Sequence, residues 1–109
     1  GAASEPAFVN SWVNYGGGAP NTRFRKYPDG SVEVQVNITS GSPTTAVIFT
    51  LPVGYRPSGT LQFPWTLFTG ADYRPTSQLV ITSIGTVEPN NPGVSVSFAR
   101  AIVQFMGGL

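Results

Sequence analysis

The sequence predicts an all-β protein, an antiparallel β-sandwich of jelly-roll-like type with about seven or eight short strands and no significant helix. Three observations lead to this prediction. Apolar residues alternate with polar residues along several short segments, which is the period of a half-buried strand. Turn-forming residues recur about every 8–12 positions. The 109 residues include 13 Gly and 10 Pro, too many for a helical bundle because both residues destabilise helix interiors.

The clearest predicted strand is the segment 31–38. Its branched apolar residues share one face and its polar residues share the other: Val32, Val34, Val36 and Ile38 against Ser31, Glu33, Gln35 and Asn37. Residues 23–27 are the expected hairpin partner of this strand. The turn between them is Pro28-Asp29-Gly30, where Pro presets its own φ angle and Gly accepts a positive one.

Further strands are expected at 46–51, 60–63, 65–68, 78–82, 94–98 and 101–105. Pro64 separates two of them and cannot donate to a β-ladder, so an exposed edge or a bulge is expected there. Residues 88–93 are expected to form a loop, because this segment contains two Pro, two Asn and a Gly.

A chain of this length fits one domain. Residues 8–109 are therefore expected to form a single β-sandwich domain. Residues 1–7 are interpreted as a linker or a cloning remnant, since they begin with Gly1-Ala2-Ala3-Ser4.

The composition argues against several classes of partner and of chemistry. The 6 basic and 5 acidic residues give a net charge of +1, which offers little attraction for nucleic acid or anionic lipid. The chain has neither Cys nor His, so disulfides, thiolate metal sites and Ser-His-Asp or Cys-His nucleophiles are excluded. No apolar run approaches the ~20 residues of a membrane span, so no membrane insertion is expected. Charged residues make up 10% of the chain, and the weak repulsion between copies favours self-association.

The few carboxylates argue against an enzyme. A glycosidase needs two carboxylates about 5–9.5 Å apart, and Asp72 and Glu88 are the pair in predicted loops that could meet. Asp29 is better explained as a turn residue, and Glu33 as part of the solvent face of a strand. Asp72 and Glu88 with neighbouring Asn residues could hold Ca²⁺, but solvated loop amides are the ordinary explanation. We therefore expect no catalytic residue, no cofactor and no metal ligand.

The sequence contains residue types suited to binding a saccharide. Sugar rings stack their C–H faces on aromatic rings, and sugar hydroxyls need planar donors and acceptors. One segment supplies both kinds of group, and its expected ligand contacts are Trp65, Asp72, Tyr73 and Arg74. The alternative is that Trp65 and Phe68 belong to the core, because the order Trp65-x-Leu67 alternates as in a buried strand.

Three segments occur in an order that resembles the C-terminal head domains of phage tail fibres and receptor-binding proteins. They are Trp12-x-Asn14-x-Gly16, then Arg25-Lys26-x-Pro28-Asp29-Gly30-x-Val32, then Leu51-Pro52-x-Gly54-Tyr55-Arg56-Pro57. In that family a Trp-x-Asn segment leads into an Arg-rich strand, a Pro-Asp-Gly hairpin and a Gly-Tyr-Arg-Pro turn. The resemblance covers about residues 8–64. One departure is Ile84-Gly85-Thr86-Val87, which stands where the family often has a second hairpin with an Asp.

The resemblance implies a β-sandwich that forms a homotrimer at the tip of a tail fibre and binds a glycan or another receptor of the host cell envelope. It also implies a location in the virion, with assembly in the host cytoplasm. In such a trimer, Trp12 and Tyr15 are expected at the subunit interface. The alternative is that both rings pack on their own sandwich as part of an edge strand.

The expected function is non-enzymatic adhesion to a host-surface saccharide through loops between strands. The alternative is a structural trimerisation cap that ends the fibre and binds no receptor. A depolymerase is a third possibility, and it would need Asp72 or Glu88 as a catalytic carboxylate.

Overall fold

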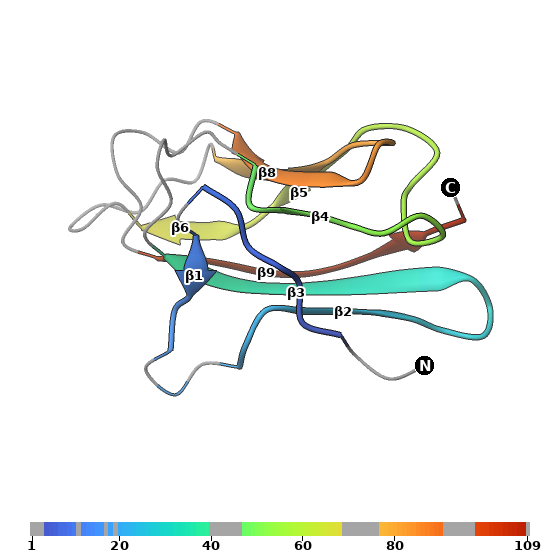
Figure 1. Cartoon of the computed structure of the whole chain (residues 1–109). Coiled ribbons are helices and arrows are strands. Elements are labelled where there is room, and N and C mark those ends of the chain that lie inside the picture. Colours follow the sequence, from blue (N-terminus) through green and yellow to red (C-terminus); the bar gives the residue numbers. More distant parts are fainter. Residues whose placement is uncertain are drawn as a thin grey trace.

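The computed structural model describes residues 4–10, 12–16, 18, 20–39, 47–68, 77–90 and 98–108. Within these ranges the chain forms nine strands in two antiparallel sheets, with no helix, and therefore no helix long enough to cross a membrane. The two sheets lie face to face as layers, β2, β3 and β9 in one and β4, β5 and β8 in the other (Figure 1). The predicted antiparallel β-sandwich is confirmed.

The first sheet is built on two long strands, β3 (Ser31–Thr39) and β9 (Phe98–Met106). They pair from Ser31↔Met106 to Ile38↔Ala99. The other strands of this sheet pair with one of these two: β1 (Val13–Asn14) and β2 (Arg23–Lys26) with β3, and β6 (Thr66–Phe68) with β9. The predicted hairpin is confirmed, since Arg23–Lys26 pairs with Val32–Gln35.

The second sheet has four strands in the order β4 (Phe49–Thr50), β8 (Thr86–Asn90), β7 (Gln78–Ile81) and β5 (Leu61–Pro64). The chain changes sheet between β3 and β4, between β5 and β6, between β6 and β7, and between β8 and β9. β7 and β8 form a hairpin within the second sheet.

The core lies between the two layers. The alternation of β3 turns Val32, Val34, Val36 and Ile38 inward, and all four are fully buried. The second sheet contributes residues such as Phe49 from β4, and the inward residues of both sheets belong to one apolar cluster. Each such side chain contributes roughly 1.5–3 kcal/mol through burial.

The chain crosses from the second sheet to the first at Trp65. β5 ends at Pro64 and is an edge strand, as expected for a residue without an N–H group. Trp65 follows with 5% of its surface exposed, and its Nε1 donates to Ser77 Oγ at 2.8 Å. Ser77 Oγ donates in turn to Asn90 O at 2.8 Å. The crossing is therefore attached to the start of β7 and the end of β8.

Three strand predictions need correction. The loop expected at 88–93 begins later, because Glu88, Pro89 and Asn90 belong to β8. Val87 O accepts from Ile48 N, so odd-numbered residues of β8 direct their backbone groups toward β4. Within β8, only Thr86 and Val87 pair with β4. Pro89 has no paired residue on the β4 side among the described residues, so its missing N–H interrupts no ladder bond.

The other two corrections concern strand length. The strand expected at 46–51 is confined to Phe49–Thr50 in the described residues. The strands expected at 94–98 and 101–105 are one strand where they are described, since β9 runs without interruption over Phe98–Met106. Residues 94–97 lie outside the described residues.

The segment expected to be a linker is attached to the first sheet where it is described. Ser4 and Phe24 exchange two backbone hydrogen bonds of 2.8 and 2.9 Å. Phe8, just beyond this segment, meets Phe49 edge to face at 6.4 Å between ring centroids. The N-terminal residues from Ser4 onward therefore cover one side of the core.

Candidate functional site

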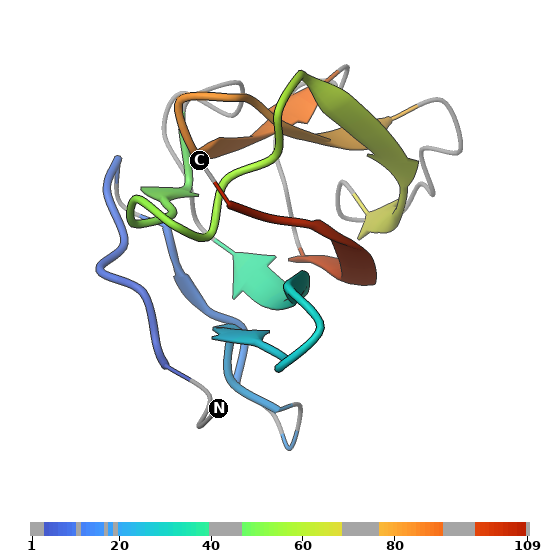
Figure 2. The same ribbon diagram turned by 90° about the vertical axis from the view of Figure 1, so that its right-hand side faces the viewer.

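Two of the three segments that carry the family resemblance, the Pro-Asp-Gly hairpin and the Gly-Tyr-Arg-Pro turn, meet at one end of the sandwich, the end seen in Figure 2. The third lies at the opposite end of β3, where Val13 and Asn14 pair with Thr39 and Ile38. Lys26 Nζ donates to Gly54 O at 2.7 Å, which joins β2 to the turn after β4. The Tyr55 ring meets the Phe24 ring edge to face at 5.3 Å. Arg56 Nε donates to Leu51 O at 2.8 Å and closes this turn on itself. The Gly-Tyr-Arg-Pro element therefore holds the two sheets together and is a structural part of the fold.

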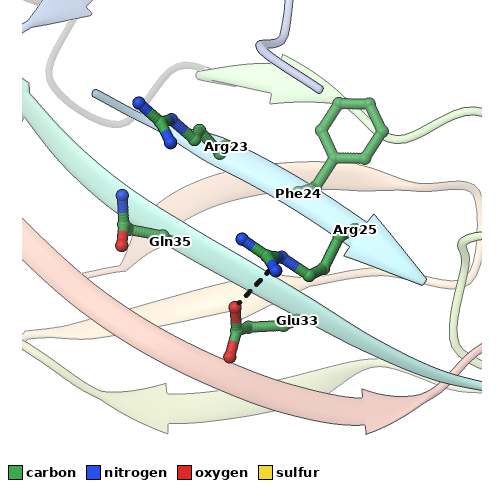
Figure 3. A pocket seen from close by; sticks show the side chains of 5 residues that line it. All are labelled: Arg23, Phe24, Arg25, Glu33 and Gln35. Atoms are coloured by element: carbon green, nitrogen blue, oxygen red, sulfur yellow. Dashed lines mark ion pairs between the residues drawn. The ribbon is translucent and has the colours of Figure 1, made fainter. Parts of the chain in front are cut away.

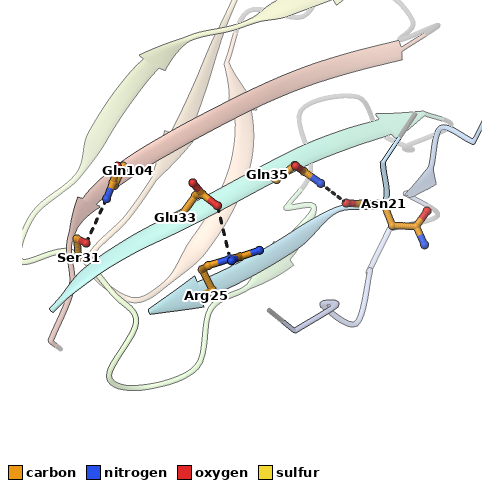
Figure 4. A network of polar contacts seen from close by, with 6 residues as sticks. All are labelled: Asn21, Arg25, Ser31, Glu33, Gln35 and Gln104. Carbon is orange, nitrogen blue, oxygen red and sulfur yellow. Dashed lines mark hydrogen bonds and ion pairs between the residues drawn. The ribbon is translucent and has the colours of Figure 1, made fainter. Parts of the chain in front are cut away.

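The outward face of the first sheet is where polar side chains gather. Toward the hairpin turn they are paired with one another, as Figure 4 shows. Gln104 Nε2 donates to Ser31 Oγ at 3.1 Å, and Gln35 Nε2 donates to Asn21 O at 2.7 Å. Arg25 Nε lies 3.6 Å from Glu33 Oε1. Apart from Arg23, the polar side chains in this part of the face therefore already have partners.

A small hollow lies among these paired residues, between β2 and β3 (Figure 3). Its volume of about 30 Å³ has room for a water molecule and little more. The Arg25–Glu33 pair beside it is about one third exposed on each side chain, and such a pair contributes little stability. This hollow is therefore no candidate for a ligand of any size.

A larger groove lies toward the other end of the same face. Three strands position its polar groups, because Arg100 of β9 is paired with Asn37 of β3 on one side and with Thr66 of β6 on the other. Ile102 and part of Trp65 line the rest, and the volume is about 280 Å³. That volume is near the lower end of the roughly 300–1,000 Å³ range of small-molecule sites. We call this the Asn37–Arg100 groove.

The Asn37 side chain has an unusual environment. Asn37 is 5% exposed, yet its amide group has no hydrogen-bond partner among the described residues. Its backbone N–H and C=O are satisfied, by the hydroxyl of Thr22 and by the N–H of Tyr15. A buried amide without a partner loses about 1–3 kcal/mol of hydration. Its position in the lining of the groove therefore indicates that a ligand or ordered water completes its hydrogen bonds.

Three aromatic rings stand in a row next to the groove. Phe98 and Phe68 are paired residues of β9 and β6, and their rings stack at 5.0 Å between centroids. The Tyr15 ring lies 5.0 Å from that of Phe98 on the other side. All three rings are at least partly exposed, and Phe98 is two residues from Arg100 on the same face. We call these residues the aromatic row.

The predicted ligand contacts are only partly described. Asp72, Tyr73 and Arg74 lie outside the described residues, so their roles stay predictions. Trp65 lines the groove, but its ring is packed in the core and its N–H is bonded to Ser77. The structure thus supports the alternative, a core position, for most of the Trp65 ring.

The two residues predicted for a subunit interface differ sharply. Trp12 is 1% exposed and belongs to the core of its own chain, so its ring offers no surface to a neighbour. Tyr15 is 44% exposed and carries one end of the aromatic row. For Trp12 the alternative of packing on its own sandwich is the one observed, beside the edge strand β1.

The sequence does not single out Asn37 or Arg100. Asn37 appears only as one of the polar residues on the outer face of a strand, and Arg100 falls between two predicted strands. Asn37 and Arg100 become neighbours through the pairing of β3 with β9, which brings together residues distant in the chain. Among the described residues, no three acidic side chains come together to form a metal site.

Comparison of the chain with protein-family models, with curated proteins and with solved structures found no match. The groove and the aromatic row are therefore interpreted from their own chemistry.

Proposed function

We propose that this protein is a non-enzymatic adhesion module that binds a surface saccharide through the Asn37–Arg100 groove and the aromatic row. The single observation that carries the proposal is the buried Asn37 amide without a described partner, which lines an open groove next to exposed rings. Saccharides present hydroxyls, which need planar donors and acceptors, and C–H faces, which pack on aromatic rings. Both kinds of surface lie side by side here.

The biological setting of the proposal comes from the family resemblance. Two of the three segments that resemble phage tail-fibre heads, the hairpin and the Gly-Tyr-Arg-Pro turn, are joined by the Lys26–Gly54 and Phe24–Tyr55 contacts. On the resemblance itself we propose that the module lies at the tip of a tail fibre, as a homotrimer that attaches to the host cell. Several weak sites on one particle gain strength from avidity when they engage one cell.

The first test is the variant Asn37→Leu, measured for glycan-array binding and for thermal unfolding. Leu has nearly the shape of Asn but no polar atoms. Because the Asn37 amide has no partner in the described chain, we expect unfolding stability to stay the same or rise while array binding is lost.

The matched control is Gln35→Leu, two residues away on the same strand and the same face. Gln35 is bonded to Asn21 O, so this change should lower stability by about 1 kcal/mol and leave saccharide binding intact. The proposal is contradicted if Asn37→Leu binds the array like the wild type, or if no glycan is bound by the wild type.

One observation favours the second candidate, a structural trimerisation cap. Ile102 and Met106 are 67% and 62% exposed on the outward face of β9. Among the described residues, β6 covers this edge of β9 only over Phe98–Arg100, which leaves 101–106 without a neighbouring strand on that side. Light scattering on a sizing column tests it, with Ile102→Lys and Met106→Lys together. A cap predicts a trimer that this double variant dissociates, and no glycan binding.

A further inference from the structure

Arg100 differs from Arg25, Lys26 and Arg56 in what surrounds it, and it shares its lack of a charged partner with Arg23. Arg25 faces Glu33, Lys26 is bonded to Gly54 O, and Arg56 is bonded to Leu51 O. Arg100 is exposed and has neither an ion pair nor a hydrogen bond with any described residue. Its guanidinium therefore keeps its full set of donors for another molecule.

The immediate neighbours of Arg100 on the sheet carry no carboxylate. Asn37 and Thr66 face it from the adjacent strands, and Phe98 and Ile102 precede and follow it on the same side of β9. Opposite charges on adjacent strands stabilise a sheet, and Arg25 has such a partner in Glu33. Near Arg100 that place is taken by an amide and a hydroxyl, which can themselves donate to an anion.

The groups in the groove fit a carboxylate better than a neutral hydroxyl. A guanidinium is a planar fork that binds the two oxygens of a carboxylate together. The Asn37 amide lines the same groove and can donate to the same anion or to a neighbouring hydroxyl. We propose that the Asn37–Arg100 groove is specific for acidic saccharides, whose carboxylate binds Arg100 while the sugar ring packs against the aromatic row. This inference rests on the proposed function and specifies its ligand.

Arg23 offers a matched control for charge. It is also exposed and also without an ion pair among the described residues, and it lies on the same face of the same sheet. It lines the small hollow between β2 and β3 and not the groove. Removing its charge changes the net charge of the protein by the same amount as removing that of Arg100.

The experiment is an array of uronic-acid and sialic-acid glycans, each printed beside its neutral methyl ester. The wild type should bind the acids at least about tenfold more strongly than the esters. Arg100→Gln should bring this ratio close to one, Arg100→Lys should leave an intermediate ratio, and Arg23→Gln should leave it unchanged. Binding to the acids should also weaken as NaCl is raised, because the contact is ionic.

The outcomes separate this inference from the proposed function. Equal binding of acids and esters by the wild type overturns the acid specificity and leaves saccharide binding in place. A ratio that falls in Arg23→Gln as much as in Arg100→Gln overturns the assignment to the groove. Absence of binding to every glycan on the array overturns both the inference and the proposed function.

Discussion

Two hairpins of the described residues, β2–β3 in the first sheet and β7–β8 in the second, share one turn geometry but are stabilised by different groups. In each, the residue three before the turn glycine accepts from that glycine's N–H: Tyr27 O from Gly30 N, and Thr82 O from Gly85 N. Both glycines have positive φ, 94° and 90°. Each glycine leads directly into the second strand, through the sequence Gly-Ser-Val-Glu in the first hairpin and Gly-Thr-Val-Glu in the second. A turn of this kind is typical of three-residue hairpin loops.

The stabilising groups differ in their chemistry. In the first hairpin, Asp29 accepts hydrogen bonds from the amide and the hydroxyl of Ser31 at 2.9 and 2.7 Å. In the second, the hydroxyls of Thr82 and Thr86 lie 2.6 Å apart and no carboxylate takes part. A Gly with positive φ is therefore the shared requirement, and the Asp is replaceable. This explains how Ile84-Gly85-Thr86-Val87 takes part in a hairpin without an Asp in the turn.

The atoms that pack against the two glycines also differ. Substituting these glycines is expected to give the largest change in the free energy of unfolding. A Cβ on Gly85 would lie 2.6 Å from Leu51 O, a backbone atom, and 2.5 Å from Arg56 Nε. A Cβ on Gly30 would lie 3.2 Å from Met106 Cε, the end of a flexible side chain. Gly85→Ala should lower the free energy of unfolding by about 3 kcal/mol or more, and Gly30→Ala should lower it by about 1–2 kcal/mol. Urea unfolding measures both, and equal costs would contradict the packing difference.

The next effect concerns the buried hydroxyl that precedes each hairpin. Thr22 is fully buried, and its Oγ1 accepts from Asn37 N at 3.0 Å. Ser77 is fully buried and bonds both Trp65 Nε1 and Asn90 O. Thr22→Val and Ser77→Ala each leave buried backbone or indole groups unpaired, so each should cost about 1–3 kcal/mol. Thermal unfolding is the measurement, and a neutral result for either variant would contradict the assigned hydrogen bonds.

A smaller effect is expected for the hydroxyl pair of the second turn. Thr86→Val removes one partly buried hydrogen bond to Thr82, so it should cost about 0.5–1.5 kcal/mol. Hydrogen exchange of the Thr86 amide should quicken, while that of the Ser31 amide should not change. Faster exchange at both positions would mean that the two hairpins open together.

The smallest effect is a dependence on pH that the first hairpin has and the second lacks. Hydrogen bonds from the amide and then the hydroxyl of Ser31 hold the pKa of Asp29 below its ordinary value of 3.8. A lowered carboxyl pKa contributes stability above the unfolded value, and this contribution is lost as the pH falls through the folded value. The difference in unfolding temperature between wild type and Asp29→Asn should therefore shrink below about pH 4.

The corresponding difference between wild type and Thr86→Val serves as the control, since no titrating group takes part in that turn. It should stay constant over the same pH range. An Asp29→Asn difference that also stays constant would show that the carboxylate does not stabilise the turn.

The two hairpins also show how far the sequence predicts the fold. The first is predicted well, because strict alternation in β3 and the Pro28-Asp29-Gly30 turn are local signals. The second strand of the second hairpin is predicted poorly, because Pro89 resembles a strand breaker. Its tolerance depends on which side of β8 its missing N–H faces and on where β4 ends. Both are properties of the pairing, and the sequence carries no local sign of them.

The candidate site is less predictable than the fold. Asn37, Thr66 and Arg100 are ordinary polar residues in their own segments, and they become neighbours through the pairing of three strands. Trp65 illustrates the opposite case, since an aromatic residue near polar ones suggests a platform but is held in the core by Ser77. When the polar residues of a site come from different strands of a sheet, no regular spacing in the sequence identifies them.

The most direct test of the central claim is a titration of isotope-labelled protein, followed by NMR, with the glycan that gives the highest array signal. We expect saturable shifts of the Asn37 side-chain amide, of Arg100 Nε and of the Tyr15 and Phe98 rings, with little change at Gln35 and Gln104. Shifts confined to Arg23, Arg25 and Glu33, or saturable binding without change at Asn37 and Arg100, would contradict the assignment of the groove as the saccharide site.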